Sequence, residues 1–182
     1  MNFFASLPPL QATLLKLAFP LIAIVAVLLV AKHRRLSFRE NLGLILPRPG
    51  QAALWLAIYL AWMLTTNLIM DWRGPWDFSP WAQSPMIINV LRVLAVAILG
   101  PIAEELIFRG LLYDRFSRTR LGATVTIVIL AVVWAGIHFS YPPEVIALLF
   151  VDGLLLGFAR RQTGSVVVPI LMHVAWNLYA VW

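Results

Sequence analysis

Residues 10–31 read LQATLLKLAFPLIAIVAVLLVA, a largely apolar run that Lys16 and Pro20 interrupt. A helix that crosses the hydrocarbon layer of a bilayer needs about 20 predominantly apolar residues. The run has that length, and a basic stretch, KHRR at 32–35, follows it directly. We therefore predict a membrane-spanning helix here. The preceding Met1–Gln11 has no basic n-region and no small-residue cleavage site, so we expect it to remain in the mature protein.

Five further stretches of the chain are apolar enough to predict helices of the same kind. They cover Gln51–Met70, Ile87–Phe116, Leu121–Phe139, Glu144–Ala159 and Ser165–Trp182. The third span is too long for one straight crossing, and Gly100-Pro101 near its middle predicts a kink. Between the second and third spans, Asp71–Met86 mixes three tryptophans with three prolines, which predicts an interfacial loop.

Composition supports the same fold class. Hydrophobic residues make up 62% of the 182 residues and charged residues 12%, against roughly 25% charged in ordinary soluble domains. A soluble domain of this size could not cover its surface with so few charges. We predict an all-α, polytopic transmembrane bundle of about six helices in one membrane domain. The absence of cysteine excludes disulfides, thiolate metal ligands and a cysteine nucleophile.

The positive charges indicate an orientation rather than a nucleic-acid partner. The net charge is +6, but the basic residues fall in short runs between apolar spans, which is the pattern that sets membrane topology. Ten of them lie after the first, third and fifth spans: Lys32, Arg34, Arg35, Arg39, Arg48, Arg115, Arg118, Arg120, Arg160 and Arg161. Arg73 lies on the opposite side. We therefore predict a multi-pass protein of the cell membrane with both termini outside the cytoplasm.

The third span holds three ionisable residues, Glu104, Glu105 and Arg109. Each such group costs about 2.5–3.5 kcal/mol at the centre of a membrane helix, and helix formation requires none of them. Glu105 and Arg109 are four residues apart, so they share a helix face and can pair. Glu104 is rotated by about 100° from Glu105 and can face another neighbour. The alternative, that the charges lie at a helix end and extend to water, suits Arg109 better than the short Glu104.

The fourth and sixth spans each carry a histidine with a partner four residues away. Trp134 precedes His138, and His173 precedes Asn177. A single helical histidine is more often a packing residue than a catalyst, and a single asparagine can serve as an interhelical bond. Polar groups in hydrocarbon gather in the interior of a bundle, however. We therefore expect a carboxylate, two imidazoles and an amide to meet there.

Asp152 is a further acidic residue inside a predicted span, directly before Gly153. Gly153 and Gly157 form a Gly-x-x-x-Gly spacing, which is typical of close packing between membrane helices. We expect a structural role for this stretch. The alternative is that Asp152 hydrogen-bonds a catalytic histidine from behind.

Three motifs carry a resemblance to a known family, and in chain order they read EELIFR (104–109), WAGIH (134–138) and HVAWN (173–177). The set resembles the CAAX-protease and bacteriocin-processing (Abi) family, whose pattern is Glu-Glu-x-x-x-Arg, aromatic-x-x-x-His and His-x-x-x-Asn or Asp. The aromatic is often Phe, so Trp134 is a mild departure. The resemblance covers roughly 87–182, as a catalytic four-helix core, while residues 1–86 match nothing specific and form two variable spans and the loop.

The resemblance implies peptide-bond hydrolysis within the membrane. It assigns Glu104 as the base that activates a water, assisted by His138. It makes His173 and Asn177 the oxyanion site and gives Glu105 and Arg109 a supporting role. A carboxylate in a poorly hydrated site can act as a base near neutral pH, and imidazole and amide donors can stabilise an oxyanion there.

Two other hypotheses remain open. Glu104, His138 and His173 could bind zinc, since two His and one Glu form a known catalytic zinc set, although the resemblance favours a metal-free enzyme without cofactor. The chain could also be a non-enzymatic transporter or accessory subunit, because intramembrane Glu, Arg and His mark ion pathways as well. As an enzyme it would act on membrane-anchored proteins or peptides. We expect protein sorting or peptide processing rather than prenyl-protein processing.

Overall fold

The computed structural model of the chain describes residues 7–70 and 83–181. Every regular element in these ranges is helical, which confirms the all-α class. In chain order they are α1 (Pro9–His33), α2 (Pro49–Met70), α4 (Met86–Val93), η2 (Leu94–Leu99), α5 (Gly100–Glu105), η3 (Leu106–Leu112), α6 (Tyr113–Ser117), α7 (Gly122–Gly136), α8 (Pro143–Thr163) and α9 (Val167–Val181). The segments from α4 to α6 follow one another without a break, so the described residues form the six predicted helices.

The helix ends differ from the predicted ones in two places that matter for the site. The fourth helix was predicted to reach Phe139, but α7 ends at Gly136 and places His138 in the turn that follows. The fifth was predicted to end at Ala159, but α8 continues to Thr163. Most of the interfacial loop predicted over Asp71–Met86 lies outside the described residues.

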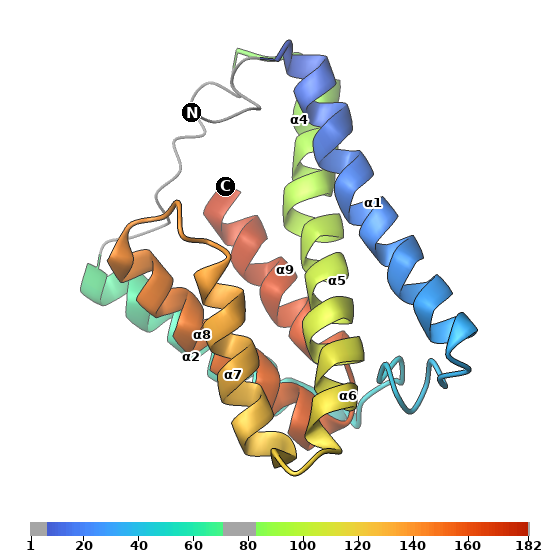
Figure 1. Ribbon diagram of the computed structural model, residues 1–182. Coiled ribbons are helices and arrows are strands. Elements are labelled where there is room, and N and C mark those ends of the chain that lie inside the picture. Colours follow the sequence, from blue (N-terminus) through green and yellow to red (C-terminus); the bar gives the residue numbers. More distant parts are fainter. Residues whose placement is uncertain (1–6, 71–82, 182) are drawn as a thin grey trace.

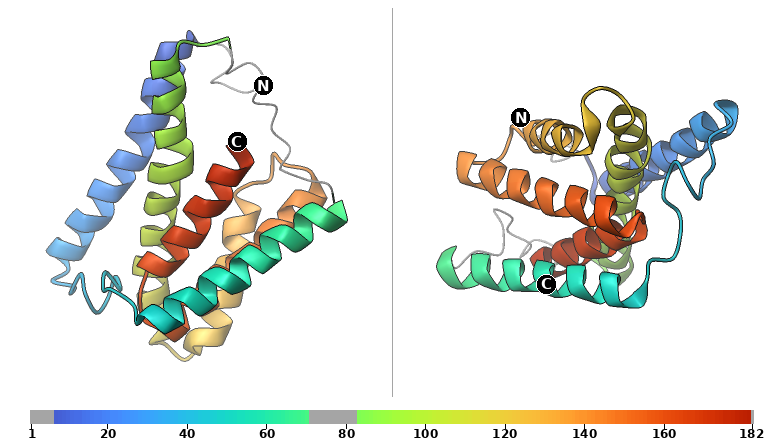
Figure 2. Two further views of the ribbon diagram at one scale, coloured as in Figure 1. Left: turned by 180° about the vertical axis from the view of Figure 1, so that it is seen from behind. Right: turned by 90° about the horizontal axis from the view of Figure 1, so that it is seen from below.

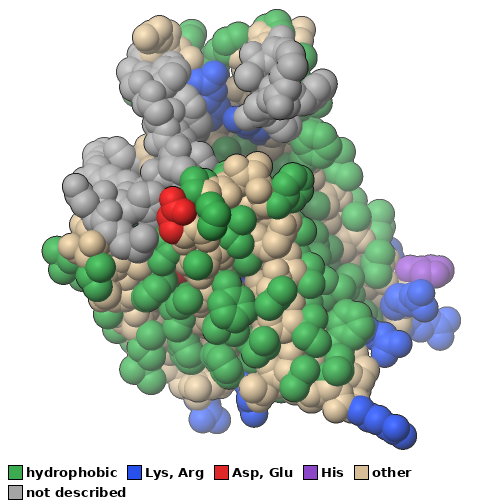
Figure 3. Space-filling model, turned by 60° about the vertical axis from the view of Figure 1, so that its left-hand side comes forward, with side chains coloured by type: hydrophobic (Ala, Val, Ile, Leu, Met, Phe, Trp, Pro, Cys, Tyr) green, Lys and Arg blue, Asp and Glu red, His purple; other side chains and the backbone are tan. Residues whose placement is uncertain are grey.

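Three helices in the described ranges are long and apolar enough to cross a membrane. They are Pro9–His33, Pro49–Ile69 and the continuous Met86–Ser117. Helices α7 and α9 are also apolar but have only 15 residues each, and α8 carries Glu144, Asp152, Arg160 and Arg161. The six predicted spans are therefore three long candidate spans joined by three other helices. Hydrophobic side chains cover most of the face shown in Figure 3, as expected of a protein surrounded by lipid.

The long third helix departs from α geometry on both sides of α5. Its segments η2 and η3 are π-helical, and the N–H of Gly100 donates to the carbonyl of Ala95, five residues back. Single π turns inside α-helices occur frequently at functional sites. Two π segments thus bracket the stretch that carries Glu104 and Glu105, and the kink expected at Gly100-Pro101 stays a prediction.

Helix α9 lies at the centre of the molecule (Figures 1 and 2). It packs against η2 and α5 on one side and against α2 and α8 on the other. Helix α1 covers the outer side of α4, η2 and α5. Helices α7 and α8 form a closely packed pair. The two glutamates of α5 and the His173 and Asn177 of α9 therefore lie on elements that contact each other.

The loop between α1 and α2 is fastened to the link between α8 and α9. The carbonyl of Gly43 accepts a hydrogen bond from the N–H of Val166 at 2.8 Å, and the hydroxyl of Ser165 donates to the carbonyl of Ile45 at 2.6 Å. Gly43 has a φ of +73°, and a Cβ there would lie 2.6 Å from the guanidinium of Arg160. The first two helices are thus tied to the four-helix core through a turn in which only glycine fits.

Candidate active site

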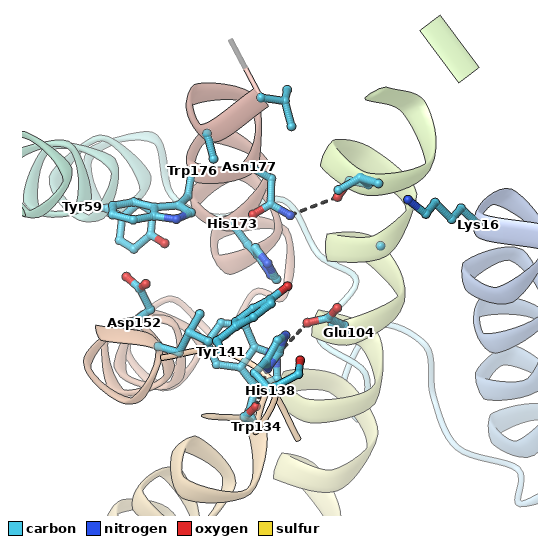
Figure 4. Close-up of a pocket in the computed structure, with 16 residues that line it drawn as sticks. Lys16, Tyr59, Glu104, Trp134, His138, Tyr141, Asp152, His173, Trp176 and Asn177 are labelled. Carbon is cyan, nitrogen blue, oxygen red and sulfur yellow. Dashed lines mark hydrogen bonds between the residues drawn. The ribbon is translucent and has the colours of Figure 1, made fainter. Parts of the chain in front are cut away.

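A cavity of about 480 Å³ opens between α1, α5, α8 and α9 (Figure 4). Four of the six predicted site residues line it: Glu104, His138, His173 and Asn177. The structure therefore brings together side chains that are up to 73 positions apart in the sequence. The other two predicted residues, Glu105 and Arg109, are buried and do not line the cavity.

Glu104 faces the cavity from α5 and is held by an indole. Trp134 Nε1 donates a hydrogen bond to Glu104 Oε2 at 2.7 Å, and Trp134 itself is almost fully buried. Its ring also packs edge-on against those of His138 and His173, with centroids 5.4 and 5.3 Å apart. The sequence pattern indicated an aromatic residue here, but it gave no sign that the aromatic would donate to the carboxylate.

His138 lies in the turn after α7, with Nδ1 placed 2.8 Å from the carbonyl oxygen of Trp134. Because a carbonyl oxygen can only accept, this geometry assigns the proton to Nδ1. The neutral imidazole then keeps a lone pair on Nε2. The side chain lines the cavity, so it can offer that lone pair to a group bound there.

Glu105, Arg109 and His173 form a buried hydrogen-bonded set. Glu105 Oε1 accepts from Arg109 Nη1 at 2.8 Å and lies 3.0 Å from His173 Nδ1. Arg109 Nη2 also donates to the carbonyl of Gly153 at 3.1 Å. The predicted Glu105–Arg109 pair is confirmed. The second partner of Glu105 is His173 of α9, a contact that the sequence did not predict. Through this contact Glu105 orients the imidazole from its Nδ1 side.

Asn177 lines the cavity one helical turn after His173. Its Nδ2 donates to the carbonyl of Val96 at 3.0 Å. Val96 lies in the π-helical η2, where the shifted backbone pairing changes the neighbours available to each carbonyl. One N–H of the Asn177 amide therefore holds α9 against the third helix. The amide nitrogen carries a second N–H donor.

Asp152 lines the same cavity from α8 and is 2% exposed. Its Oδ1 accepts a hydrogen bond from Trp62 Nε1 of α2 at 2.8 Å. The bond to Trp62 is the structural tie expected at this position, and no hydrogen bond joins Asp152 to a histidine within the described part of the chain. The sequence did not predict that Asp152 would line the cavity. Asp152 thus adds a second carboxylate to the cavity wall.

The zinc hypothesis does not fit the arrangement of these side chains. No three His, Asp or Glu residues in the ranges 7–70 and 83–181 are grouped as metal ligands would be. The Nδ1 contacts, of His138 with a backbone carbonyl and of His173 with Glu105, do not bear on this question, because zinc-bound histidines commonly bind through Nε2 with Nδ1 held in this way. Glu104, in turn, is held by the indole of Trp134.

Comparison with known proteins agrees with this geometry. Residues 86–179 match the Rce1-like family, described as type II CAAX prenyl endopeptidase Rce1-like. The chain belongs to the Rce1-like family. The match begins at α4 and ends within α9, so it contains all three motifs and leaves α1 and α2 outside. It confirms the resemblance drawn from those motifs.

One curated protein is similar to part of the chain. It is an "Uncharacterized 24.3 kDa protein" of Escherichia coli, 33% identical over a 91-residue alignment that covers 46% of this chain and 40% of that protein. The chain thus aligns with less than half the length of this relative. No solved structure matches the chain. Membership of the Rce1-like family identifies a CAAX-type protease relationship, and the substrate has to be argued separately.

Proposed function

We propose that the chain is an intramembrane endopeptidase in which Glu104 activates the attacking water. The observation that supports this most strongly is the shared cavity. Glu104, His138 and His173 come from α5, from the turn after α7 and from α9, and all three line one space. Packing alone does not require three such groups to converge in an apolar bundle.

In this reaction Glu104 takes a proton from water as the water oxygen attacks the carbonyl carbon of the peptide bond. His138 assists by accepting a hydrogen bond from that water at Nε2. His173 and Asn177 donate to the oxyanion of the tetrahedral intermediate. The C–N bond then breaks, and Glu104 returns its proton to the leaving amine. Preorganised donors of this kind typically contribute 10²–10³ in kcat each.

Glu105 and Arg109 act as positioning residues in this proposal. Neither lines the cavity, but Glu105 holds the Nδ1 side of His173. With Nδ1–H bonded to a carboxylate, His173 can donate from Nε2 only as the imidazolium, which the negative charge of Glu105 stabilises and which directs the second N–H toward the oxyanion. The Arg109 guanidinium balances the charge of Glu105.

The substrate class follows from where the site lies. The cavity is set among apolar helices, and α1 and α4 carry many exposed hydrophobic side chains. We propose membrane-anchored proteins or peptides as substrates, processed near a transmembrane or C-terminal segment. Protein sorting or bacteriocin-type processing fits this class, as does the removal of a CAAX tripeptide.

The test is the substitution Glu104→Gln, which keeps the hydrogen bond from Trp134 possible and removes the base. The chain and the variant are expressed in membranes of a strain that lacks the gene, and C-termini of membrane proteins are compared by mass spectrometry. We expect C-terminally trimmed products with the wild type and a loss of at least about 10³ in their rate of appearance with the variant.

Glu144→Gln is the matched control, because Glu144 is exposed at the start of α8 and lies outside the cavity. It should process like the wild type. If Glu104→Gln processes as fast as the control while both insert normally, the chain is not a glutamate-dependent protease. Activity abolished by a chelator and restored by zinc would replace the water mechanism with a metal-dependent one.

A further inference from the structure

The end of the cavity away from Glu104 has its own chemistry. Three cavity-lining residues gather there, Tyr59 of α2, Asp152 of α8 and Trp176 of α9. In Figure 4 they lie together on one side of His173, while Glu104 lies on the other side. Resting on the proposed function, we infer that this group, the Asp152 subsite, binds a positively charged group of the substrate peptide.

The carboxylate of Asp152 is fixed and faces the cavity. The indole of Trp62 holds Oδ1 at 2.8 Å, and the phenol of Tyr59 points toward the carboxylate in Figure 4. A buried carboxylate is costly unless a cation or hydrogen bonds compensate it. An interhelical tie alone could be made by a neutral side chain. Asp152 therefore offers the cavity a fixed hydrogen-bond acceptor that can carry a negative charge, and a cation bound beside it would favour the charged form.

The walls beside Asp152 suit a cation as well. Tyr59 and Trp176 pack edge-on, with ring centroids 6.3 Å apart at an angle of 60°, and both are at least 94% buried. Ammonium and guanidinium groups bind favourably over the faces of Trp and Tyr, and more strongly when water is excluded. A carboxylate next to two aromatic rings is thus matched to a lysine, an arginine or a free amino group.

The basic groups that lie closest to Asp152, His173 and Arg109, are both bonded to Glu105. Arg109 is bonded to Glu105 and to the carbonyl of Gly153. Lys16 lines the cavity from α1, but Figure 4 places it on the side opposite Asp152. The catalytic groups make no hydrogen bond to Asp152 in the described part of the chain. The subsite therefore lies beside the hydrolytic groups and makes no hydrogen bond to them, and Tyr59, like the Trp62 that holds Asp152, comes from α2, outside the Rce1-like match.

Binding can be measured without hydrolysis in the Glu104→Gln chain, reconstituted in phosphatidylcholine nanodiscs so that lipid charge plays no part. The probes are fluorescent nine-residue apolar peptides, blocked at both ends, that differ only in a central Lys, Arg or norleucine. A fourth probe is the norleucine peptide with a free N-terminus. Fluorescence anisotropy gives each dissociation constant, with protein-free nanodiscs as the blank.

We expect at least one cationic probe to bind about tenfold or more tightly than the blocked norleucine peptide. The Lys and Arg probes report a basic side chain, and the fourth probe reports an N-terminal amine. Adding Asp152→Asn, which can still accept the bond from Trp62, should bring that ratio close to one. Adding Glu144→Gln, on the same helix, should leave it unchanged.

Equal affinities for all four probes, no detectable binding, or a preference that survives Asp152→Asn would each overturn the subsite. Because the base is absent throughout, none of these results depends on whether the chain hydrolyses peptides. A cation preference in nanodiscs with no processing in cells would instead leave the subsite standing and remove the proposed protease function.

Discussion

One oxygen of Glu105 links two helices of the site. Oε1 is shared by Arg109 Nη1 and His173 Nδ1, at 2.8 and 3.0 Å. Oε2 is buried without a hydrogen-bond partner among the residues that the structure describes. A buried carboxylate with one unsatisfied oxygen depends heavily on the cation beside it. Arg109, itself 2% exposed, is that cation.

Arg109→Met keeps an unbranched, flexible side chain, shorter than that of Arg, and removes its charge. Because the variant leaves Glu105 buried without its counter-charge, we expect a loss of about 3–5 kcal/mol in the free energy of unfolding. Denaturant titration of the purified chain in detergent micelles, followed by tryptophan fluorescence, measures the loss.

Arg118→Met is the matched control for that experiment. Arg118 also pairs with a carboxylate four residues away, Asp114, at 2.6 Å, but its side chain is 63% exposed. Exposed pairs contribute about 0–1 kcal/mol, so this variant should unfold almost like the wild type. Similar losses in the two variants would show that burial does not determine the strength of the Glu105–Arg109 pair.

Residue spacing predicted part of this site and could not predict the rest. Helical geometry places residues four apart on one face, which is why the Glu105–Arg109 pair followed from the sequence. The contacts of Glu105 with His173 and of Glu104 with Trp134 join different helices. They depend on how those helices rotate against each other, and a single sequence does not fix that rotation. The same holds for the cavity position of Asp152.

At the scale of elements, two glycines set the distance between α7 and α8. A Cβ at Gly153 would lie 2.9 Å from the Cβ of Ala131, and one at Gly157 would lie 2.6 Å from Ile127 Cγ2. The close packing predicted from the Gly-x-x-x-Gly spacing is confirmed. Gly153 also accepts the bond from Arg109, so this contact fixes the helix that carries Asp152 relative to the buried ion pair.

Gly153→Ala should therefore push α8 away from α7. Its Cβ would also lie 3.0 Å from the Cα of Ala131, in a helix backbone that cannot move aside on its own. We expect about 1–3 kcal/mol of destabilisation from overpacking, measured by the same denaturant titration. Gly136→Ala is the control: nothing lies within 4 Å of its Cβ position, so it should not destabilise the chain. Equal effects would argue against the close contact.

At the scale of the whole molecule, apolar composition and length predicted six helices correctly. Hydropathy did not reveal that α7 stops before His138. It also gave no sign that the α1–α2 loop is fastened to Ser165 and Val166. Both features result from contacts between distant parts of the chain. The fastened loop holds α1 and α2, which lie outside the family match, against the rest of the chain. These helices supply Lys16, Tyr59 and Trp62 to the region of the site.

The orientation in the membrane remains a prediction from the ten basic residues on one side, and the chain is well suited to test it because it contains no cysteine. Single reporters are introduced as Gln83→Cys and Arg118→Cys. Both positions are exposed, and they lie just before the start and just after the end of the helix Met86–Ser117. Since basic loops stay in the cytoplasm, a membrane-impermeant maleimide should label Gln83→Cys in right-side-out vesicles. It should reach Arg118→Cys only after detergent is added. Because one crossing separates the two reporters, the opposite pattern would place the basic run around Arg118 outside and reverse the predicted topology.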